Sequence, residues 1–190
     1  TGTARMRLGA SYLIDSISTI STDVWTHVAG TYDGTNLKIY LNGVLDNTVP
    51  QTGAIPSTSG SLQIGAANTG NKFDGNISNA AIFTLALTQD QILTIYNGGA
   101  PNDISSLSPV GWWSLSGDSY FANDWICPDL STNSNNGTSN GIPVTALVGN
   151  APGSTANGTG TSMAIPTNLQ GNAPNSDKNA ISINMVATNR

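Results

Sequence analysis

Three features of the sequence predict an all-β sandwich with one short helix. Residues 25–65 alternate apolar and polar side chains, which is the period of a strand with one buried face. Turn dipeptides such as Asp33-Gly34 and Asn42-Gly43 interrupt this alternation. Only residues 88–96 carry a convincing helical pattern. These features indicate consecutive antiparallel strands arranged as a β-meander.

The strand over residues 37–41 shows the alternation most clearly. One face carries Leu37, Ile39 and Leu41, and the other carries Lys38, Tyr40 and Asn42. Asn42-Gly43 predicts a type I′ hairpin, because both central positions of that turn need a positive φ. The turn therefore sets the register of residues 37–41 against residues 44–49.

A helix is expected after a strand over residues 76–84. Thr88 is its predicted N-cap, and Gln91 lies three residues later, as a capping box requires. The helix should end at residues 97–99 (Asn-Gly-Gly), because glycine favours the left-handed conformation that follows a helix. Pro101 then prevents a restart.

Residues 25–99 also contain a series of motifs in a characteristic order. These are WTHVAGTYDGTNLKIYLNGV (25–44), SLQIG (61–65), FDGNISNAAIF (73–83) and ALTQDQILTIYNGG (86–99). The series resembles the C-terminal half of laminin-G-like or pentraxin-like domains of the concanavalin A-like lectin superfamily. The resemblance implies a jelly-roll β-sandwich, in which His27 has a structural position. That fold carries lectins, glycosidases and adhesive modules, so it does not define an activity.

A second resemblance lies downstream, in an unusual position. GWWSL (111–115) and DLSTNSNNGT (129–138) resemble the opening strand and Asn-rich turn of the same family. That opening normally precedes the meander, whereas here it follows. Too few residues follow Ser139 to complete a second sandwich. We therefore expect an appended strand that packs on the first sandwich or on a neighbouring molecule.

These observations predict three regions. Residues 1–100 form the sandwich, residues 101–139 a linker with a docked strand, and residues 140–190 an extended arm. Few residues precede Trp25, so the sandwich is expected to lack its N-terminal strands or to receive them from elsewhere.

The expected arm contains an imperfect repeat of about 22 residues, too short for a core of its own. GTSNGIPVTALVGNAPGS (137–154) realigns on GTSMAIPTNLQGNAPNS (160–176). The arm should gain order on a partner surface through a few apolar residues, and a disordered tail is the alternative. These apolar assembly residues are Ile142, Leu147, Ile165 and Leu169.

The segment PNDISSLSPVGWW (101–113), placed between the helix and an Asn/Ser-rich tail, is similar to structural proteins of marine tailed phages. Charged residues make up 9% of the chain, against about 25% in average proteins, which fits a virion or extracellular setting. A net charge of −5 without a basic cluster argues against nucleic acid as a partner. No apolar run is long enough for a membrane span.

Two functions follow as hypotheses. The first is a non-enzymatic virion structural or decoration protein that assembles through its arm with copies of itself or other subunits, and that could adhere to host glycans. The second is a secreted or cell-surface lectin. A glycosidase is disfavoured, because the chain has no Glu and its only carboxylate pair, Asp118 and Asp124, lies in a loop-like segment.

Calcium is the one cofactor for which the sequence offers ligands. Asp129, Ser131, Asn133 and Asn135 present oxygen atoms at alternate positions, as hard cations require. The alternative is an Asx-rich turn, in which these side chains bond to their own backbone.

Two aromatic residues are candidates for ligand contact. Trp113 shares a strand face with Leu115, which places Trp112 on the opposite face. Tyr40 likewise lies on the polar side of its strand. Each ring could stack on a sugar, contact a neighbouring subunit or be covered by the helix and tail. Cys127, the single cysteine, is expected to pack as a small hydrophobic residue.

Overall fold

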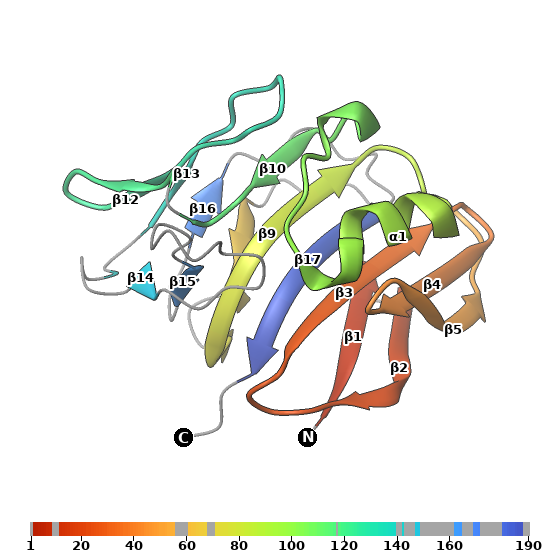
Figure 1. Ribbon diagram of the computed structural model, residues 1–190. Helices are drawn as coiled ribbons and strands as arrows, with labels where there is room; N and C mark the ends of the chain where they lie inside the picture. Colours follow the sequence, from red (N-terminus) through yellow and green to blue (C-terminus); the bar gives the residue numbers. More distant parts are fainter. Residues whose placement is uncertain are drawn as a thin grey trace.

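The computed structural model describes residues 2–8, 12–55, 61–67, 71–116, 118–139, 142, 147–148, 162–164, 169–171 and 180–187, and its strands form a β-sandwich (Figure 1). In chain order the elements are β1 (Gly2–Leu8), β2 (Tyr12–Ile20), β3 (Trp25–Tyr32), β4 (Asn36–Leu41), β5 (Val44–Pro50), β6 (Leu62–Ile64), β7 (Ala66–Ala67), β8 (Asn71–Lys72), β9 (Gly75–Phe83), α1 (Gln89–Tyr96), the 3-10 turns η1 (Asn97–Gly99) and η2 (Ser105–Leu107), β10 (Gly111–Trp113), β11 (Tyr120–Phe121), β12 (Trp125–Cys127), β13 (Gly137–Thr138), β14 (Leu147–Val148), β15 (Ser162–Ala164), β16 (Leu169–Gly171) and β17 (Ala180–Ala187).

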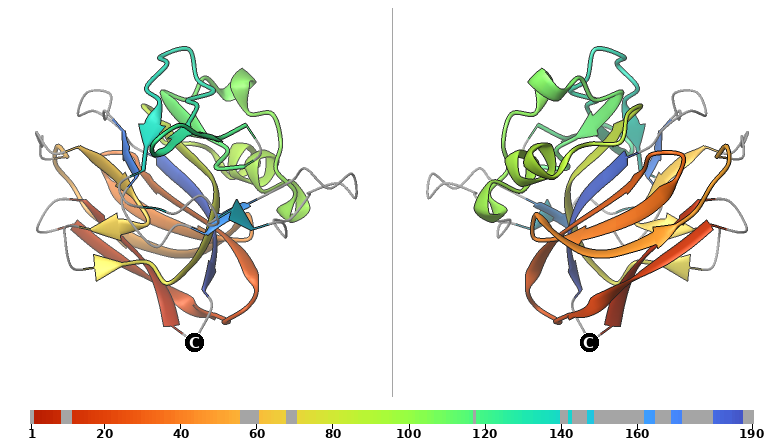
Figure 2. Two further views of the ribbon diagram at one scale, coloured as in Figure 1. Left: turned by 90° about the vertical axis from the view of Figure 1, so that its left-hand side faces the viewer. Right: turned by 90° about the vertical axis from the view of Figure 1, so that its right-hand side faces the viewer.

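An eight-stranded antiparallel sheet dominates the described residues. Its order is β14-β15-β9-β17-β3-β4-β5, and β10 also pairs with β9. One face of this sheet is covered by the β1–β2 hairpin and by a five-stranded sheet of order β11-β12-β13-β16-β6. Helix α1 lies against the opposite face (Figures 1 and 2). The predicted all-β sandwich with one short helix is therefore confirmed.

Three apolar clusters form the core, one under each covering element. The first lies between β9 and the five-stranded sheet and centres on Trp113 and Trp125. The second lies under α1 and includes Tyr40, Phe83 and Ile92. The third lies under β1 and β2 and is built from Ala4, Ile14, Tyr32, Leu37 and Ile39.

The predicted hairpin turn is confirmed. Asn42 and Gly43 have φ values of 50° and 78°, both positive as a type I′ turn requires. The register contains one feature that the alternation did not predict. Ile39 lies opposite Asn47 while Tyr40 lies opposite Leu45, so Asp46 is an extra residue in β5 and forms a β-bulge.

The predicted capping box of α1 is also present. The backbone N–H of Gln91 donates to Thr88 Oγ1, and the Gln91 side chain accepts from the Thr88 N–H. At the other end, Asn97 adopts the left-handed conformation with φ 44°. The Gln89 amide donates to the carbonyl of Gly43, which ties the start of the helix to the hairpin turn.

The segment that resembles the family's opening strand docks within its own molecule. β10 pairs antiparallel with β9, with Trp113 opposite Ala80 and Gly111 opposite Ile82. Asn79 has a φ of 53° and forms a bulge in β9, and its N–H donates to the Ser114 carbonyl (3.0 Å). Strands from late in the chain therefore take part in the sandwich. The sequence had indicated instead that the sandwich lacks its N-terminal strands or receives them from another chain.

The predicted arm is corrected by the position of β17. This strand lies between β3 and β9, pairing with residues 25–31 on one side and residues 75–83 on the other. Figures 1 and 2 show it in the middle of the large sheet. Its sequence, AISINMVA, is rich in β-formers, and the two edges of β3 and β9 offer it a complete set of backbone partners. Residues 180–187 thus do not depend on a neighbouring molecule for order.

Three of the predicted assembly residues have places within this fold. Ile142 is 2% exposed and packs in the cluster of Trp113 and Trp125, so its predicted contact with a neighbour is wrong. Leu169 lies in β16, which pairs with β6, and Leu147 lies in β14, which pairs with β15. Ile165 and most of the imperfect repeat lie outside the described residues.

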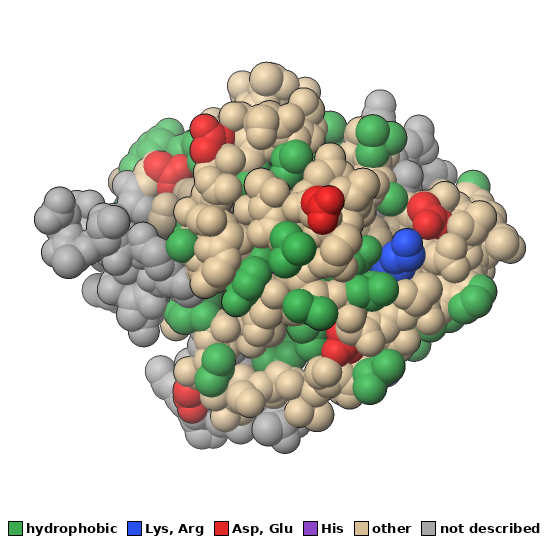
Figure 3. Space-filling model, turned by 45° about the vertical axis from the view of Figure 1, so that its right-hand side comes forward, with side chains coloured by type: hydrophobic (Ala, Val, Ile, Leu, Met, Phe, Trp, Pro, Cys, Tyr) green, Lys and Arg blue, Asp and Glu red, His purple; other side chains and the backbone are tan. Residues whose placement is uncertain are grey.

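The surface is mostly uncharged. Figure 3 shows one face on which hydrophobic and uncharged polar side chains predominate and acidic groups are scattered. No helix in the described part of the chain is long and apolar enough to cross a bilayer.

We expect truncation after Thr138 to unfold the sandwich. The deletion removes β17 and leaves the edges of β3 and β9 unpaired across the centre of the sheet, which exposes backbone groups and the clusters on both faces. Circular dichroism should show loss of β-sheet signal and of a cooperative thermal transition. Truncation after Ala187, which retains β17, is the control. A truncated chain that keeps the β-sheet signal and its transition would contradict this result.

We expect Gly43→Ala to destabilise the fold more than Gly34→Ala. Both glycines have a positive φ, 78° and 89°, so alanine costs roughly 1–2 kcal/mol at either position. A Cβ at Gly43 would also meet Leu93 and Tyr96 at 2.9 Å, whereas nothing lies within 4 Å of one at Gly34. The collision adds roughly 1–3 kcal/mol. Urea denaturation measures both variants, and equal losses would exclude the contact with α1.

Candidate functional site

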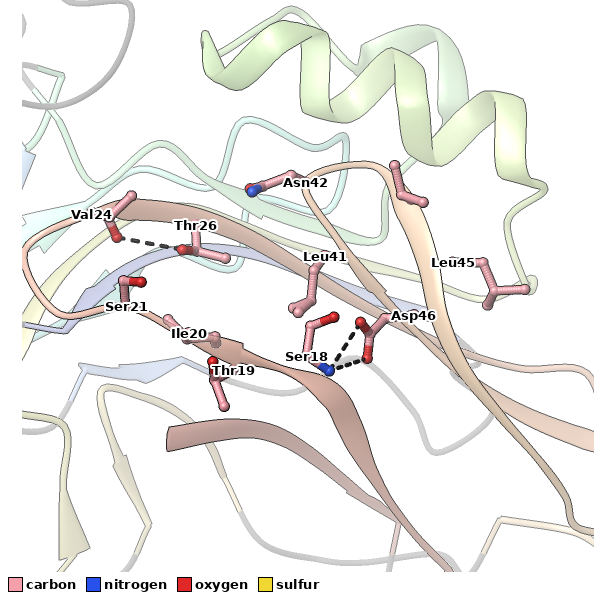
Figure 4. Close-up of a pocket in the computed structure, with 11 residues that line it drawn as sticks. Ser18, Thr19, Ile20, Ser21, Val24, Thr26, Leu41, Asn42, Leu45 and Asp46 are labelled. Carbon is pink, nitrogen blue, oxygen red and sulfur yellow. Dashed lines mark hydrogen bonds between the residues drawn. The ribbon is translucent and has the colours of Figure 1, made fainter. Parts of the chain in front are cut away.

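An open groove lies at the edge of the large sheet, between the end of β2 and the tip of the β4–β5 hairpin (Figure 4). It encloses about 340 Å³, which is within the usual range for small-molecule sites. Its lining combines hydroxyl, amide, carboxylate and aliphatic groups. The lining residues are Ser18, Thr19, Ile20, Ser21, Val24, Thr26, Leu41, Asn42, Val44, Leu45 and Asp46.

The groove exists because of the β-bulge in β5. The bulge turns the Asp46 carboxylate toward β2, where it accepts hydrogen bonds from the backbone N–H groups of Ile17 (2.5 Å) and Ser18 (3.2 Å). These bonds, together with a bond from the Asn47 amide to the Asp15 carbonyl (2.8 Å), connect β5 to β2. Beyond these bonds the two strands diverge, as Figure 4 shows, and the space between them is the groove.

Asp46 is the one charged side chain in the lining. Burial raises the pKa of its carboxyl, but hydrogen bonds from Ser18 and Ile17 outweigh this effect and hold the pKa below its ordinary value. The carboxylate is therefore ionised at neutral pH. An ionised carboxylate offers about four acceptor positions, so two backbone donors leave it able to accept from a ligand.

Asn42 supplies a donor on the opposite side of the groove. Its Oδ1 accepts from the His27 N–H (3.0 Å), and its own N–H donates to the His27 carbonyl (2.9 Å). With Oδ1 held in this way, the side-chain N–H groups can donate to a ligand. The exposed hydroxyls of Ser18, Thr19 and Ser21 add groups that both donate and accept.

Aliphatic side chains form the rim. Val24, Val44 and Leu45 are 51%, 62% and 43% exposed. Side chains of this kind gain free energy when a ligand covers them. The groove thus offers an acceptor, several donors and an apolar surface within one small volume.

The calcium candidates form a turn instead. Asp129 Oδ1 accepts from the N–H groups of Trp112 and Ser131 (both 2.9 Å), and Oδ2 accepts from the Asn135 N–H (2.8 Å). The Asn133 amide donates to the Val110 carbonyl (2.9 Å). These bonds correspond to the Asx-rich turn, and they fasten residues 129–135 to β10. In the described residues no three His, Cys, Asp or Glu side chains gather at one place.

The two aromatic candidates lie in the core or beside it. Tyr40 is 3% exposed in the cluster under α1, so its predicted ligand-binding role is wrong: the helix covers the face that the alternation assigned to polar groups. Trp112 is half-buried against the same cluster, with its Nε1 3.5 Å from Asn79 Oδ1. The cavity beside it encloses about 10 Å³, barely enough for one water. Trp112 therefore packs under the helix side of the sandwich.

Asp118 and Cys127 are held within the fold. The Asp118 carboxylate accepts hydrogen bonds from the hydroxyls of Ser114 and Ser116. Asp124 lies between β11 and β12, where its backbone carbonyl accepts from the Ala122 N–H (3.0 Å). Cys127 is fully buried, and burial raises the pKa of its thiol to about 11. A thiol in that state is a poor nucleophile, in agreement with packing as a small hydrophobic residue.

His27 lies beneath the hairpin turn and is 3% exposed. Its ring centroid is 5.8 Å from that of Tyr96 in α1. Burial lowers the pKa of this imidazole to about 4, so the ring is neutral at physiological pH. The family resemblance implied a structural position for His27, and its burial agrees with that expectation.

Comparison with known proteins supports the fold and a broad functional class. Residues 3–93 match the laminin-G profile described as the concanavalin A-like lectin/glucanases superfamily. Pappalysin-1 from Mus musculus is 33% identical over 75 residues, which cover 37% of this chain and 5% of pappalysin-1. This chain thus corresponds to a small part of that relative. No solved structure matches it.

The sequence did not predict the groove residues as a site. Asn42 was interpreted as a turn residue, which it is, and Asp46 was one of several isolated acidic residues. The pairing of β4 with β5 was predicted from the turn, but no local motif indicates the extra residue at Asp46. The exposed aliphatic pair Val44-Leu45, next to a hairpin turn, was the one available signal.

We expect acid to weaken the fold through His27. Its pKa is 6.5 when unfolded and about 4 when folded, so between these values the unfolded chain binds more protons. Stability is therefore complete above pH 6.5 and decreases as pH falls toward 4, by up to about 3 kcal/mol. Urea unfolding at pH 7 and pH 4.5 measures the loss, with His27→Gln as the control. A variant with the same pH dependence as the native chain would exclude His27 as the cause.

Proposed function

We propose that this chain is a non-catalytic adhesion module that binds carbohydrate in the groove between β2 and the β4–β5 hairpin. The observation that carries the proposal is the groove itself, on a domain of the lectin/glucanase superfamily. Sugar hydroxyls both donate and accept hydrogen bonds, and sugar rings also present apolar C–H faces. The groove offers partners for each of these groups.

The acceptor and donor on opposite sides support this function. Asp46 accepts from ligand hydroxyls, Asn42 donates to them, and Val24 and Val44 contact the ring carbons. Because Asp46 and Asn42 are each held by backbone hydrogen bonds, little conformational entropy is lost when a ligand binds. The residues sit on a hairpin that α1 holds in place, so the site is preorganised.

A catalytic role is disfavoured by the acidic residues. Glycosidases need two carboxyl groups on either side of the scissile bond, and this chain has no Glu. The groove contains one carboxylate, Asp46. Asp118, the earlier candidate, lies outside the lining and accepts from two serine hydroxyls.

A virion decoration role is the second candidate, favoured by one sequence observation. The segment 101–113 is similar to structural proteins of marine tailed phages, and the low charge content fits a virion or extracellular location. In such a setting the groove would attach the particle to surface glycans. Light scattering of the full chain tests the self-association that this role requires.

We expect the full chain to bind glycans without cleaving them. A glycan array identifies bound sugars, and calorimetry with the best binder should give a dissociation constant in the micromolar to millimolar range, because the groove is small and open. Reducing-end assays on the same sugars should show no turnover. Turnover that disappears in Asp46→Asn or Asp118→Asn would instead establish a glycosidase, and an array without any binder would contradict the proposed function.

A further inference from the structure

The chemistry of the groove defines a narrower class of ligand, an inference that rests on the proposed function. We propose that the groove binds an uncharged sugar that carries a methyl group, either as a deoxyhexose or as an N-acetyl substituent, and that it rejects anionic glycans.

The charge of the lining excludes anionic sugars. Asp46 is ionised at neutral pH, and the lining holds no Lys or Arg to offset it. Two described cations are already engaged elsewhere: Arg5 lies 2.6 Å from Asp15, and Lys38 lies 3.9 Å from Asp33. The chain as a whole carries a net charge of −5. A sulfate or carboxylate in the groove would therefore meet repulsion from Asp46 without a compensating partner.

The geometry of Asp46 and Asn42 favours an uncharged ligand with free hydroxyl groups. The Asp46 carboxylate accepts from the backbone N–H groups of Ile17 and Ser18 and from the Ser18 side chain, and an ionised carboxylate has about four acceptor positions, so one is left for a ligand. A sugar hydroxyl can donate to this carboxylate and accept from the Asn42 amide. An anionic oxygen cannot donate, so it would leave Asp46 without a ligand partner.

The aliphatic rim explains the need for a methyl group. Val24 and Val44 both line the groove and expose more than half of their surface. A ring-stacking platform, which would hold an unsubstituted sugar by its C–H face, is absent from this lining. A methyl group placed against either valine would remove more apolar surface from water than a hydroxymethyl or hydroxyl group could.

The test compares four probes with the full chain: a fucose-terminated glycan, an N-acetylglucosamine oligosaccharide, an unsubstituted glucose oligosaccharide and a heparin oligosaccharide. The two methyl-bearing probes should bind at least tenfold more tightly than the glucose probe, and heparin more weakly than either. Tighter binding of heparin or of the glucose probe would overturn this inference and leave the proposed function intact. Absence of binding to all probes and to a wider array would overturn both.

Two variants, each with a matched control, test whether Asp46 causes the preference for uncharged probes and whether Val44 causes the preference for methyl-bearing probes. Asp46→Asn should reduce the preference for uncharged over anionic probes at least tenfold, whereas Asp74→Asn, at an exposed turn outside the groove, should leave it unchanged. Val44→Thr should weaken binding of the methyl-bearing probes several-fold more than binding of the glucose probe. Ile17→Thr, 73% exposed and outside the lining, is its control. If Asp46→Asn does not fold, the comparison of Val44→Thr with Ile17→Thr still tests the inference. Equal binding of the methyl-bearing probes by these two variants would overturn it.

Discussion

The pairing of β17 with both β3 and β9 is the constraint on which the rest of the structure depends. Without it, β3-β4-β5 and β9 with its partners would be separate sheets with two open edges. With it, Ala29 on β3 and Ala81 on β9 lie opposite the same residue, Ser182, and so share one face. The cluster under α1 spans both strands for this reason. A strand from the end of the described chain thereby joins elements formed near its beginning.

The hairpin between β4 and β5 links that sheet to the groove. Gly43 fits beneath α1 because it lacks a Cβ, and the Gln89 amide holds its carbonyl. Asn42, next to it, is held by both backbone groups of His27. The turn is thus fixed from two sides, by the helix and by β3. This rigidity allows a small edge groove to keep its donors and acceptors in place.

In the proposed function, the groove binds through hydrogen bonds and apolar contact rather than through long-range electrostatics. The single carboxylate of its lining would select by repulsion as much as by attraction, which is a common way to discriminate between similar ligands. Aromatic residues are the usual platforms for sugars, but Tyr40, Trp113 and Trp125 are buried in the core, and the exposed Tyr120 and Phe121 lie outside the groove lining.

The sequence by itself determined the local structure. The alternation over residues 37–41, the Asn42-Gly43 turn and the capping box at Thr88 each depend on neighbouring residues and on backbone preferences, so the pattern was sufficient to predict them. The family motifs predicted the sandwich for the same reason, because they report strand faces and turns in order.

Only the tertiary structure decided which strands pair across the chain and what covers each face. The sequence pattern predicts that Tyr40 is exposed, whereas α1 packs over it. The pattern also predicts that Ile142 contacts a neighbouring molecule, whereas it packs in the core cluster of Trp113 and Trp125. The position of β17 depends on edges contributed by distant segments, and the bulge at Asp46 aims its carboxylate at β2, which lies 28 residues away in the chain at Ser18. The backbone groups of a strand can pair with any compatible edge, so the sequence of the strand does not specify its partner. The partner is selected by the pairing that buries the most apolar surface.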